Sequence, residues 1–248
     1  MRRVKLGMVG GGQGAFIGAV HRIAARIDDR YQVIAGALSS DPERAAASAA
    51  ELGIEADRSY HSFEEMAKAE AVRPDGIDAV SIVTPNHLHA DAAIAFLEAG
   101  IHVICDKPLS VSRAEGLRIK QCLQKSSAQF FLTHNYTGYP LIREARDMVA
   151  NGKLGNIRVI QAEYAQDWLA EPLETTGQKQ ASWRTDPKAT GGCGAIGDIG
   201  THAYNLVHYV TGLEAQELAS DLTSYVPGRV VDDNAHIWLR YEGGAKGQ

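Results

Sequence analysis

The chain has 248 residues, of which 45% are hydrophobic and 22% charged, and its formal net charge is −5 at pH 7. This composition is ordinary for a folded globular protein, and the length allows one large domain or two ordinary ones. The acidic balance and the scattered basic residues argue against a nucleic-acid partner. No run approaches the ~20 apolar residues that span a bilayer, so we expect no membrane partner either.

The three cysteines, Cys105, Cys122 and Cys193, are spaced singly and odd in number. This pattern predicts free thiols rather than a disulfide framework, and it fits a reducing, cytoplasmic compartment. No Cys/His spacing typical of a metal site is present, so we predict no metal. The N-terminus enters a strand-like run directly, without the apolar core of a signal peptide.

The first half of the chain alternates apolar strand-like runs with helix-like segments. We expect strands at 4–9, 32–38, 56–60, 78–83, 102–106 and 129–133, and helices at 16–27, 42–52, 87–98 and 112–125. Ser40 and Glu43 have the spacing of a capping box at the start of the second helix. Strands that alternate with helices of this length predict right-handed crossovers and a parallel sheet.

The pattern changes after residue 133. We expect a helix at 139–151, a half-solvated strand at 156–166, a long loop at 167–197, a helix at 198–211 and strands at 215–226 and 230–242. We therefore predict two domains, 1–133 with a parallel sheet and 134–248 of α+β type. The sequence ends soon after a strand, so we expect the second sheet to be incomplete, with its C-terminal part missing.

Residues 10–21 read GGGQGAFIGAVH, a glycine cluster between a buried strand and a helix. In a dinucleotide-binding turn, the first glycine permits the bend, the second admits the pyrophosphate, and the third lets helix and strand pack closely. Gly10 and Gly12 supply the first pair, whereas Ala15 and Gly18 are both candidates for the third position. A purely structural turn is the alternative. On the phosphate-binding interpretation, the cofactor contacts of this segment are Gly10, Gly12, Gln13, Ala15, Phe16 and Ile17.

The second strand ends in Leu38-Ser39-Ser40-Asp41. Ser39 or Ser40 stands at the tip, where a ribose-binding acid is usual, and Asp41 comes one residue late. Asp41 is better explained as a helix cap. Arg44 can meet a 2′-phosphate or can be a solvated helix residue, so the sequence leaves NAD and NADP open as the cofactor.

Two further stretches follow the next two strands. TPNHLH covers residues 84–89 and DKP covers 106–108, and GDIGTH stands later at 197–202. Together with the glycine loop, and in this order along the whole chain, they resemble the Gfo/Idh/MocA oxidoreductases, which are named after glucose–fructose oxidoreductase and inositol dehydrogenase. The family motif is usually EKP, so Asp106 is a conservative departure, and the extended glycine loop is a second one.

The resemblance implies a Rossmann domain followed by an open, mostly antiparallel sheet domain, with the nicotinamide ring between them. It implies that Lys107 is the catalytic lysine, Asp198 its acidic partner and His202 the acid/base. By the same resemblance, the cofactor wall consists of Thr84, Pro85, Asn86 and His89, and Asp106 with Lys107 stands at the ribose and nicotinamide end. The open sheet face implies a homodimer or homotetramer.

The chemistry of these residues is consistent with that implication. Lys107 follows a parallel strand at its carboxyl end, where open α/β sheets bind ligands, and it can act as an uncharged base or polarise a substrate oxygen while protonated. Asp198 and His202 are four residues apart, on one face of the expected helix. A helix cap is the alternative role for Asp198, and a structural histidine is the alternative for His202.

Four more residues are candidates for substrate contact. Trp183 and Arg184 match a family feature near the substrate, although an aromatic loop anchor explains them equally well. Asn135 and Tyr136 follow the last Rossmann strand and can line the pocket or pack between domains. His21 is expected to pack near the cofactor loop.

Three functions fit these patterns. The first is an NAD- or NADP-dependent dehydrogenase that acts on a sugar, cyclitol or related polyol. The second uses transient oxidation to cleave a glycosidic bond or eliminate a group, without net redox change. The third is a cofactor or sugar sensor that regulates a partner. The presence of Lys107, Asp198 and His202 argues against a sensor, because a sensor needs no residues for proton transfer. The sequence does not identify the substrate.

Overall fold

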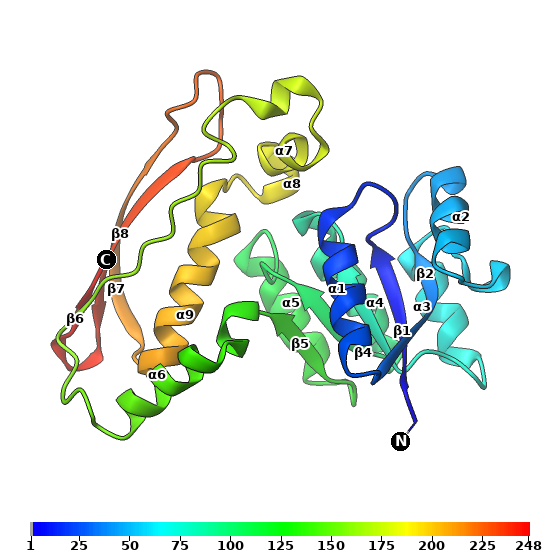
Figure 1. Cartoon of the computed structure of the whole chain (residues 1–248), viewed down its shortest axis with the longest axis horizontal. Coiled ribbons are helices and arrows are strands. Elements are labelled where there is room, and N and C mark those ends of the chain that lie inside the picture. Colours follow the sequence, from blue (N-terminus) through cyan, green and yellow to red (C-terminus); the bar gives the residue numbers. More distant parts are fainter. Residues whose placement is uncertain (1) are drawn as a thin grey trace. The chain divides into compact units, whose positions relative to one another are not determined.

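The computed structural model describes residues 2–248 and divides into two compact units (Figure 1). The first unit ends at Thr133, and the second runs from His134 to Gln248. Each unit has its own sheet, five-stranded in the first and four-stranded in the second. Within residues 2–248, no helix has both the length and the apolar character needed to cross a membrane.

The first unit is built on a parallel sheet with the strand order β2-β1-β3-β4-β5. The strands are β1 Val4–Gly10, β2 Tyr31–Ala37, β3 Ala79–Val83, β4 His102–Asp106 and β5 Phe130–Thr133. The helices are α1 Phe16–Ile27, α2 Pro42–Glu51, α3 Phe63–Val72, α4 His89–Glu98 and α5 Arg113–Leu123. Each strand therefore delivers its carboxyl end to the same edge of the sheet, and the predicted α/β class is confirmed.

Helices cover both faces of this sheet, as a fully buried parallel sheet requires. The largest core cluster joins Val80 and Val103 of the sheet to Met66 of α3, Phe96 of α4 and Ile119 of α5. A smaller cluster joins Leu6 and Ala79 of the sheet to Ala25 of α1.

For this unit, one prediction was wrong and one helix was missed. The expected strand at 56–60 is a short 3-10 helix, Ala56–Arg58, and only a single bridge, between Gly36 and Ser59, touches the sheet there. Helix α3 was missed altogether. Its signal was present, because Ser62 accepts a hydrogen bond from the backbone N–H of Glu65, which is the spacing of a capping box.

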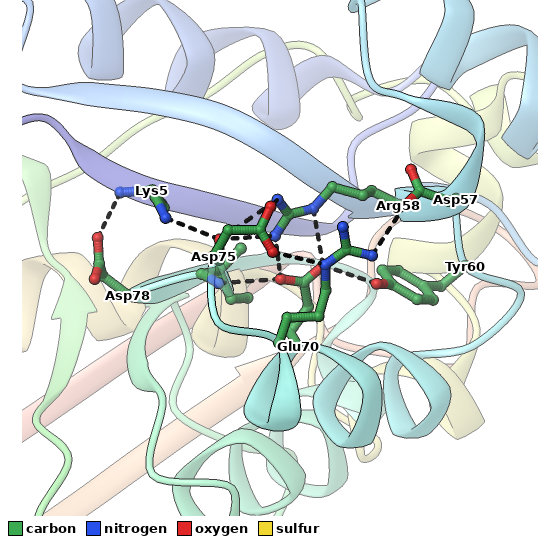
Figure 2. Close-up of polar contacts among 9 residues, drawn as sticks. Lys5, Asp57, Arg58, Tyr60, Glu70, Asp75 and Asp78 are labelled. Carbon is green, nitrogen blue, oxygen red and sulfur yellow. Dashed lines mark hydrogen bonds and ion pairs between the residues drawn. The ribbon is translucent and has the colours of Figure 1, made fainter.

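Buried Glu70 anchors α3 and obscures its helical pattern in the sequence. Its carboxylate accepts from the Nε and Nη2 of Arg58, from the Tyr60 hydroxyl at 2.8 Å and from the Ile77 backbone N–H at 3.0 Å (Figure 2). Arg58 also donates to Asp75, in the loop before β3. A charge that is fully buried in this way stays only because donors surround it.

The second unit has a mixed, mostly antiparallel sheet with the order β6-β9-β8-β7, as predicted. Its strands are β6 Val159–Ile160, β7 Ala215–Thr223, β8 Asn234–Tyr241 and β9 Lys246–Gly247. Its helices are α6 Pro140–Ala150, α7 Lys179–Arg184, α8 Pro187–Thr190 and α9 Thr201–Thr211, and a π-type turn, Ile196–Gly200, leads into α9.

The second unit also departs from the sequence prediction. Of the expected strand at 156–166, only Val159–Ile160 pairs as a strand, because its partner β9 offers only two residues. The expected loop at 167–197 contains α7 and α8. Alternation of side chains predicts an extended segment, but only a paired backbone makes it a strand of a sheet.

Candidate active site

The glycine loop after β1 turns through three residues with positive φ: Gly10 at 77°, Gly11 at 76° and Gly14 at 74°. A Cβ on Gly18 would lie only 2.4 Å from the Cα of Gly11. Gly18, rather than Ala15, is therefore the glycine that lets α1 pack closely against the loop. A Cβ on Gly12 would lie 2.7 Å from the Ser48 hydroxyl and 2.8 Å from the Leu38 carbonyl oxygen, so this position also tolerates no side chain.

The first turn of α1 suits an anion. Its N-cap residue is Ala15, whose methyl side chain cannot accept a capping hydrogen bond, and its first turn carries no acidic residue. By contrast, α2, α3 and α5 are capped by Asp41, Ser62 and Ser112. Uncapped helix N–H groups and a positive dipole end attract a phosphate group.

The side chains at the end of β2 are placed as follows. Asp41 accepts a hydrogen bond from the Arg44 backbone N–H at 2.8 Å, which makes it the N-cap of α2. The helix-cap interpretation is thus confirmed, and the cap is Asp41 rather than Ser40. Ser39 accepts a bond from the Asp41 N–H at 3.1 Å, while Ser40 and the Arg44 side chain are exposed.

The loops after β3 and β4 are joined by His89. Its ring is buried, with Nδ1 2.7 Å from the Pro108 carbonyl oxygen and Nε2 3.0 Å from the Thr84 carbonyl oxygen. Burial lowers the pKa of His89 below its ordinary value, against the opposing effect of the two carbonyls. His89 thus connects the two loops from inside, which fits a positioning role better than direct contact with a cofactor.

Thr84 links these loops to the glycine turn. A Cβ on Gly10 would lie 3.1 Å from the Thr84 methyl carbon, so the two segments lie side by side. The Thr84 hydroxyl is buried and has no hydrogen-bond partner among residues 2–248. Asn86 is buried and Pro85 half-buried in the same loop. A glycine cradle, an uncapped helix and an unsatisfied hydroxyl together fit a bound dinucleotide.

Asp106 ends β4 at the carboxyl edge of the sheet, and Lys107 follows it directly. Asp106 Oδ1 accepts a hydrogen bond from the Thr133 hydroxyl at 2.7 Å and lies 3.8 Å from His21 Nε2. The other ring nitrogen of His21 is 2.8 Å from the Ser81 hydroxyl. Burial alone would raise the pKa of Asp106, but the His21 and Thr133 contacts and the Lys107 charge lower it below its ordinary value. Asp106 is therefore a carboxylate at neutral pH.

Asp198 and His202 lie in the second unit, where the π-type turn passes into α9. Asp198 is in that turn, and His202 is a buried residue in the first turn of α9. Asp232 holds this segment in place, because its carboxylate accepts from the backbone N–H groups of Gly194 and Ile196, both at 2.7 Å. Sequence reasoning gave Asp232 no role.

Aromatic rings pack around His202. The Tyr136 ring centroid lies 4.7 Å from that of His202, and the His134 ring meets it edge-on at 5.9 Å. The Tyr136 hydroxyl is 2.5 Å from that of Tyr164. This hydrogen bond and burial raise the pKa of Tyr136 to about 12, so Tyr136 remains protonated at neutral pH. Tyr136 was a predicted substrate residue, Tyr164 was missed, and Asn135 is exposed.

Arg184 contacts Asp198 rather than standing alone in the loop. Its Nε donates to Asp198 Oδ2 at 3.3 Å, and its Nη1 donates to Gln180 Oε1 at 2.6 Å. Its Cζ lies 4.2 Å from the Trp183 ring centroid and 5.7 Å from that of Trp168. The structure therefore brings together, within the second unit, two predicted substrate residues and one predicted catalytic residue.

Among residues 2–248, neither a metal site nor an activated cysteine thiol accompanies these side chains. Within the described part of the chain, no group of three or more His, Cys, Asp or Glu side chains could hold a metal ion. The three cysteines are free thiols, and burial raises the pKa of Cys193 above its ordinary value. A neutral thiol is a poor nucleophile, so Cys193 is unsuited to covalent catalysis.

The fold and these motifs define a protein built on a dinucleotide-binding domain of the Rossmann type. Residues 4–134 match the GFO/IDH/MocA oxidoreductase family with its NAD-binding Rossmann fold, and residues 142–248 match the GFO/IDH/MocA C-terminal domain. The chain belongs to the GFO/IDH/MocA family, as its sequence motifs predicted.

Three similar proteins illustrate the range of this family. An oxidoreductase from Sinorhizobium meliloti is 53% identical, with a TM-score of 0.88 over 100% of this chain and 64% of its own. An inositol dehydrogenase homologue from Azotobacter vinelandii, solved with NADH and myo-inositol, is 35% identical, with a TM-score of 0.91 over 99% of this chain and 63% of its own. Levoglucosan dehydrogenase from Pseudarthrobacter phenanthrenivorans is 32% identical, over 92% of this chain and 56% of its own. This chain thus spans less than two thirds of the length of these relatives.

Proposed function

We propose that this protein is an NAD(P)-dependent dehydrogenase that acts on a hydroxyl carbon of a sugar, cyclitol or related polyol. One observation carries the proposal: the Asp106 carboxylate ends β4, and Lys107 follows it, at the sheet edge where the glycine cradle and Thr84 lie side by side. Ligands of open parallel sheets bind at this edge. The substrate class is supported by the inositol dehydrogenase homologue, solved with myo-inositol, and the levoglucosan dehydrogenase among the relatives.

The glycine loop and the start of α1 would hold the pyrophosphate, and the Thr84 hydroxyl is available to the same ligand. When bound, the nicotinamide accepts the hydride from the substrate carbon. Ser39, Ser40 and Arg44 at the end of β2 would meet the ribose. Asp41 is committed to capping α2, which leaves the two serine hydroxyls and the Arg44 guanidinium to decide between NAD and NADP.

The protein residues handle the proton and the developing charge on oxygen. In our proposal, the Lys107 ammonium polarises the substrate hydroxyl, and His202 accepts its proton, because imidazole exchanges protons near neutral pH. The Asp198 carboxylate stabilises the positive charge that His202 then carries. Tyr136, which stays protonated, can offer its hydroxyl group to a polyol, and the Tyr164 hydroxyl lies beside it.

The direct test is a panel of cyclitols, sugars and anhydrosugars, assayed with NAD and NADP separately. We expect net formation of reduced nicotinamide with at least one substrate. Product formation without free reduced cofactor would instead support transient internal oxidation. Tight cofactor binding with no reaction across the panel would contradict the dehydrogenase and favour a sensor.

A further inference from the structure

The guanidinium of Arg184 is held by its own surroundings. Gln180, one turn earlier in α7, presents both its side-chain oxygen, at 2.6 Å, and its backbone oxygen, at 3.3 Å, to Nη1. Gln180 Oε1 also accepts from the Trp183 indole N–H at 3.3 Å. Two indoles lie within the ~6 Å range in which a cation is attracted to an aromatic face. The position of Arg184 is therefore fixed without help from a substrate.

Arg184 presents a permanent positive charge to Asp198. The ion pair joins Nε to Asp198 Oδ2 at 3.3 Å, and the two side chains are only 19% and 22% exposed. Charges that are largely shielded from water interact more strongly than exposed ones. Arginine does not lose its proton in proteins, so the positive charge beside the Asp198 carboxylate does not depend on pH.

The position of Asp198 in the chain also supports a functional role for its contact with Arg184. Asp198 belongs to the π-type turn before α9, and π-turns are irregular segments that are frequent at functional sites. Asp232 fixes the amides at the start of this segment, whereas Arg184 fixes a carboxylate in the middle of it. The turn that carries Asp198 is thus held at two points by two side chains from other segments.

We propose, on the basis of the proposed dehydrogenase function, that Arg184 is a positioning residue that orients the Asp198 carboxylate and keeps it charged, while Trp168 and Trp183 hold Arg184. From the sequence, substrate contact and an aromatic anchor of the loop were equally good explanations for Trp183 and Arg184. The contacts with Asp198, Gln180 and the two indoles give these residues an indirect role instead. Trp168 was not among the candidates from sequence.

The first experiment is a double-mutant cycle on turnover. Arg184→Ala should lower kcat about 10- to 100-fold, the effect of losing a charged hydrogen bond that orients a reacting group, with little change in the Kd of the cofactor. In an Asp198→Asn background, the same substitution should cost less than about threefold, because coupled residues are not additive. Equal losses in both backgrounds would overturn the proposal. Arg146→Ala is the matched control, since Arg146 also lies over a ring, that of Tyr209 at 4.6 Å, but is exposed on α6.

The second experiment needs no turnover, so it separates this proposal from the proposed function. Guanidinium chloride, below denaturing concentrations, is titrated into Arg184→Ala while tryptophan fluorescence is recorded, with urea as the control. We expect a saturable change that is absent in the wild type and lost in Arg184→Ala/Asp198→Asn. No saturable change, or the same change without Asp198, would overturn the proposal. Recovery of kcat by guanidinium, where a substrate is known, would support it further.

Discussion

Two carboxylates in the first unit, one buried and one partly buried, differ in what surrounds them. Glu70 is completely buried, and its carboxylate accepts hydrogen bonds from Arg58, Tyr60 and the Ile77 backbone (Figure 2). All three donors precede β3 in the chain. Asp106 is partly buried at the carboxyl end of β4, beside the imidazole ring of His21 and the Thr133 hydroxyl. A charge with a permanent set of donors is structural, whereas a charge beside an imidazole and a lysine can respond to a ligand or a proton.

The difference also follows the geometry of a parallel sheet. The Glu70 cluster connects α3 to segments that enter β1 and β3, including Lys5, whose ammonium donates to the Asp75 carbonyl oxygen at 2.9 Å. Asp106 stands where a strand ends. Open α/β sheets bind ligands at the carboxyl ends of their strands, so the same kind of side chain has different consequences at the two edges.

The largest expected effect is on stability, at Glu70. Glu70→Gln should lower the free energy of unfolding by about 3–5 kcal/mol, because it leaves the buried Arg58 charge with only the half-exposed Asp75 carboxylate as its ionic partner. Urea unfolding is the measurement. Asp91→Asn, which removes an exposed ion pair with Arg118, is the control and should cost less than about 1 kcal/mol. A Glu70 variant as stable as this control would remove the basis of the comparison.

At Asp106 the effect should appear in activity instead. Asp106→Asn keeps the shape and the bond from Thr133 but removes the charge beside Lys107. We expect turnover to fall about 100-fold, as for a misplaced catalytic group, with a loss of unfolding free energy below about 2 kcal/mol. Steady-state kinetics and urea unfolding on the same sample measure both. Full turnover, or a stability loss equal to that of Glu70→Gln, would erase the distinction between the two carboxylates.

A smaller effect concerns pH and Tyr60. Burial and the Glu70 carboxylate raise the pKa of the Tyr60 hydroxyl from 10.0 to about 12. A raised folded-state pKa contributes stability that is complete below the unfolded value of 10.0 and is lost as pH rises through about 12. Tyr60→Phe should therefore lose less stability than the wild type between these two pH values. Unfolding midpoints across this range test it, and parallel curves for both proteins would contradict it.

The sequence predicted the parallel sheet because its strands are continuous apolar runs separated by helix-length segments. It failed at α3, where buried Glu70 interrupts the apolar stripe, since a single chain does not reveal that Arg58 and Tyr60 supply its partners. It failed at 156–166 because alternation does not show how many residues of a strand find a partner.

Within the candidate site, residue types were predictable but contacts were not. The glycines were visible, yet the choice of Gly18 over Ala15 depends on how closely α1 approaches Gly11. The sequence identified Arg184, beside Trp183, as a candidate. Its contact with Asp198, 14 residues later, depends on how α7 and the π-type turn fold. Tyr164, Trp168 and Asp232 belong to no motif, and only the folded chain brings them to the predicted residues.

The most direct test of the proposed enzyme compares Lys107→Met with the wild type, using a substrate identified in the panel. NADH or NADPH binding, followed by cofactor fluorescence, should persist with a Kd within about threefold, because the glycine cradle is unchanged. Turnover should fall by about 10²- to 10³-fold, the usual cost of removing a group that stabilises developing charge on a substrate oxygen. A Lys107→Met protein that turns over at the wild-type rate would contradict the proposed mechanism.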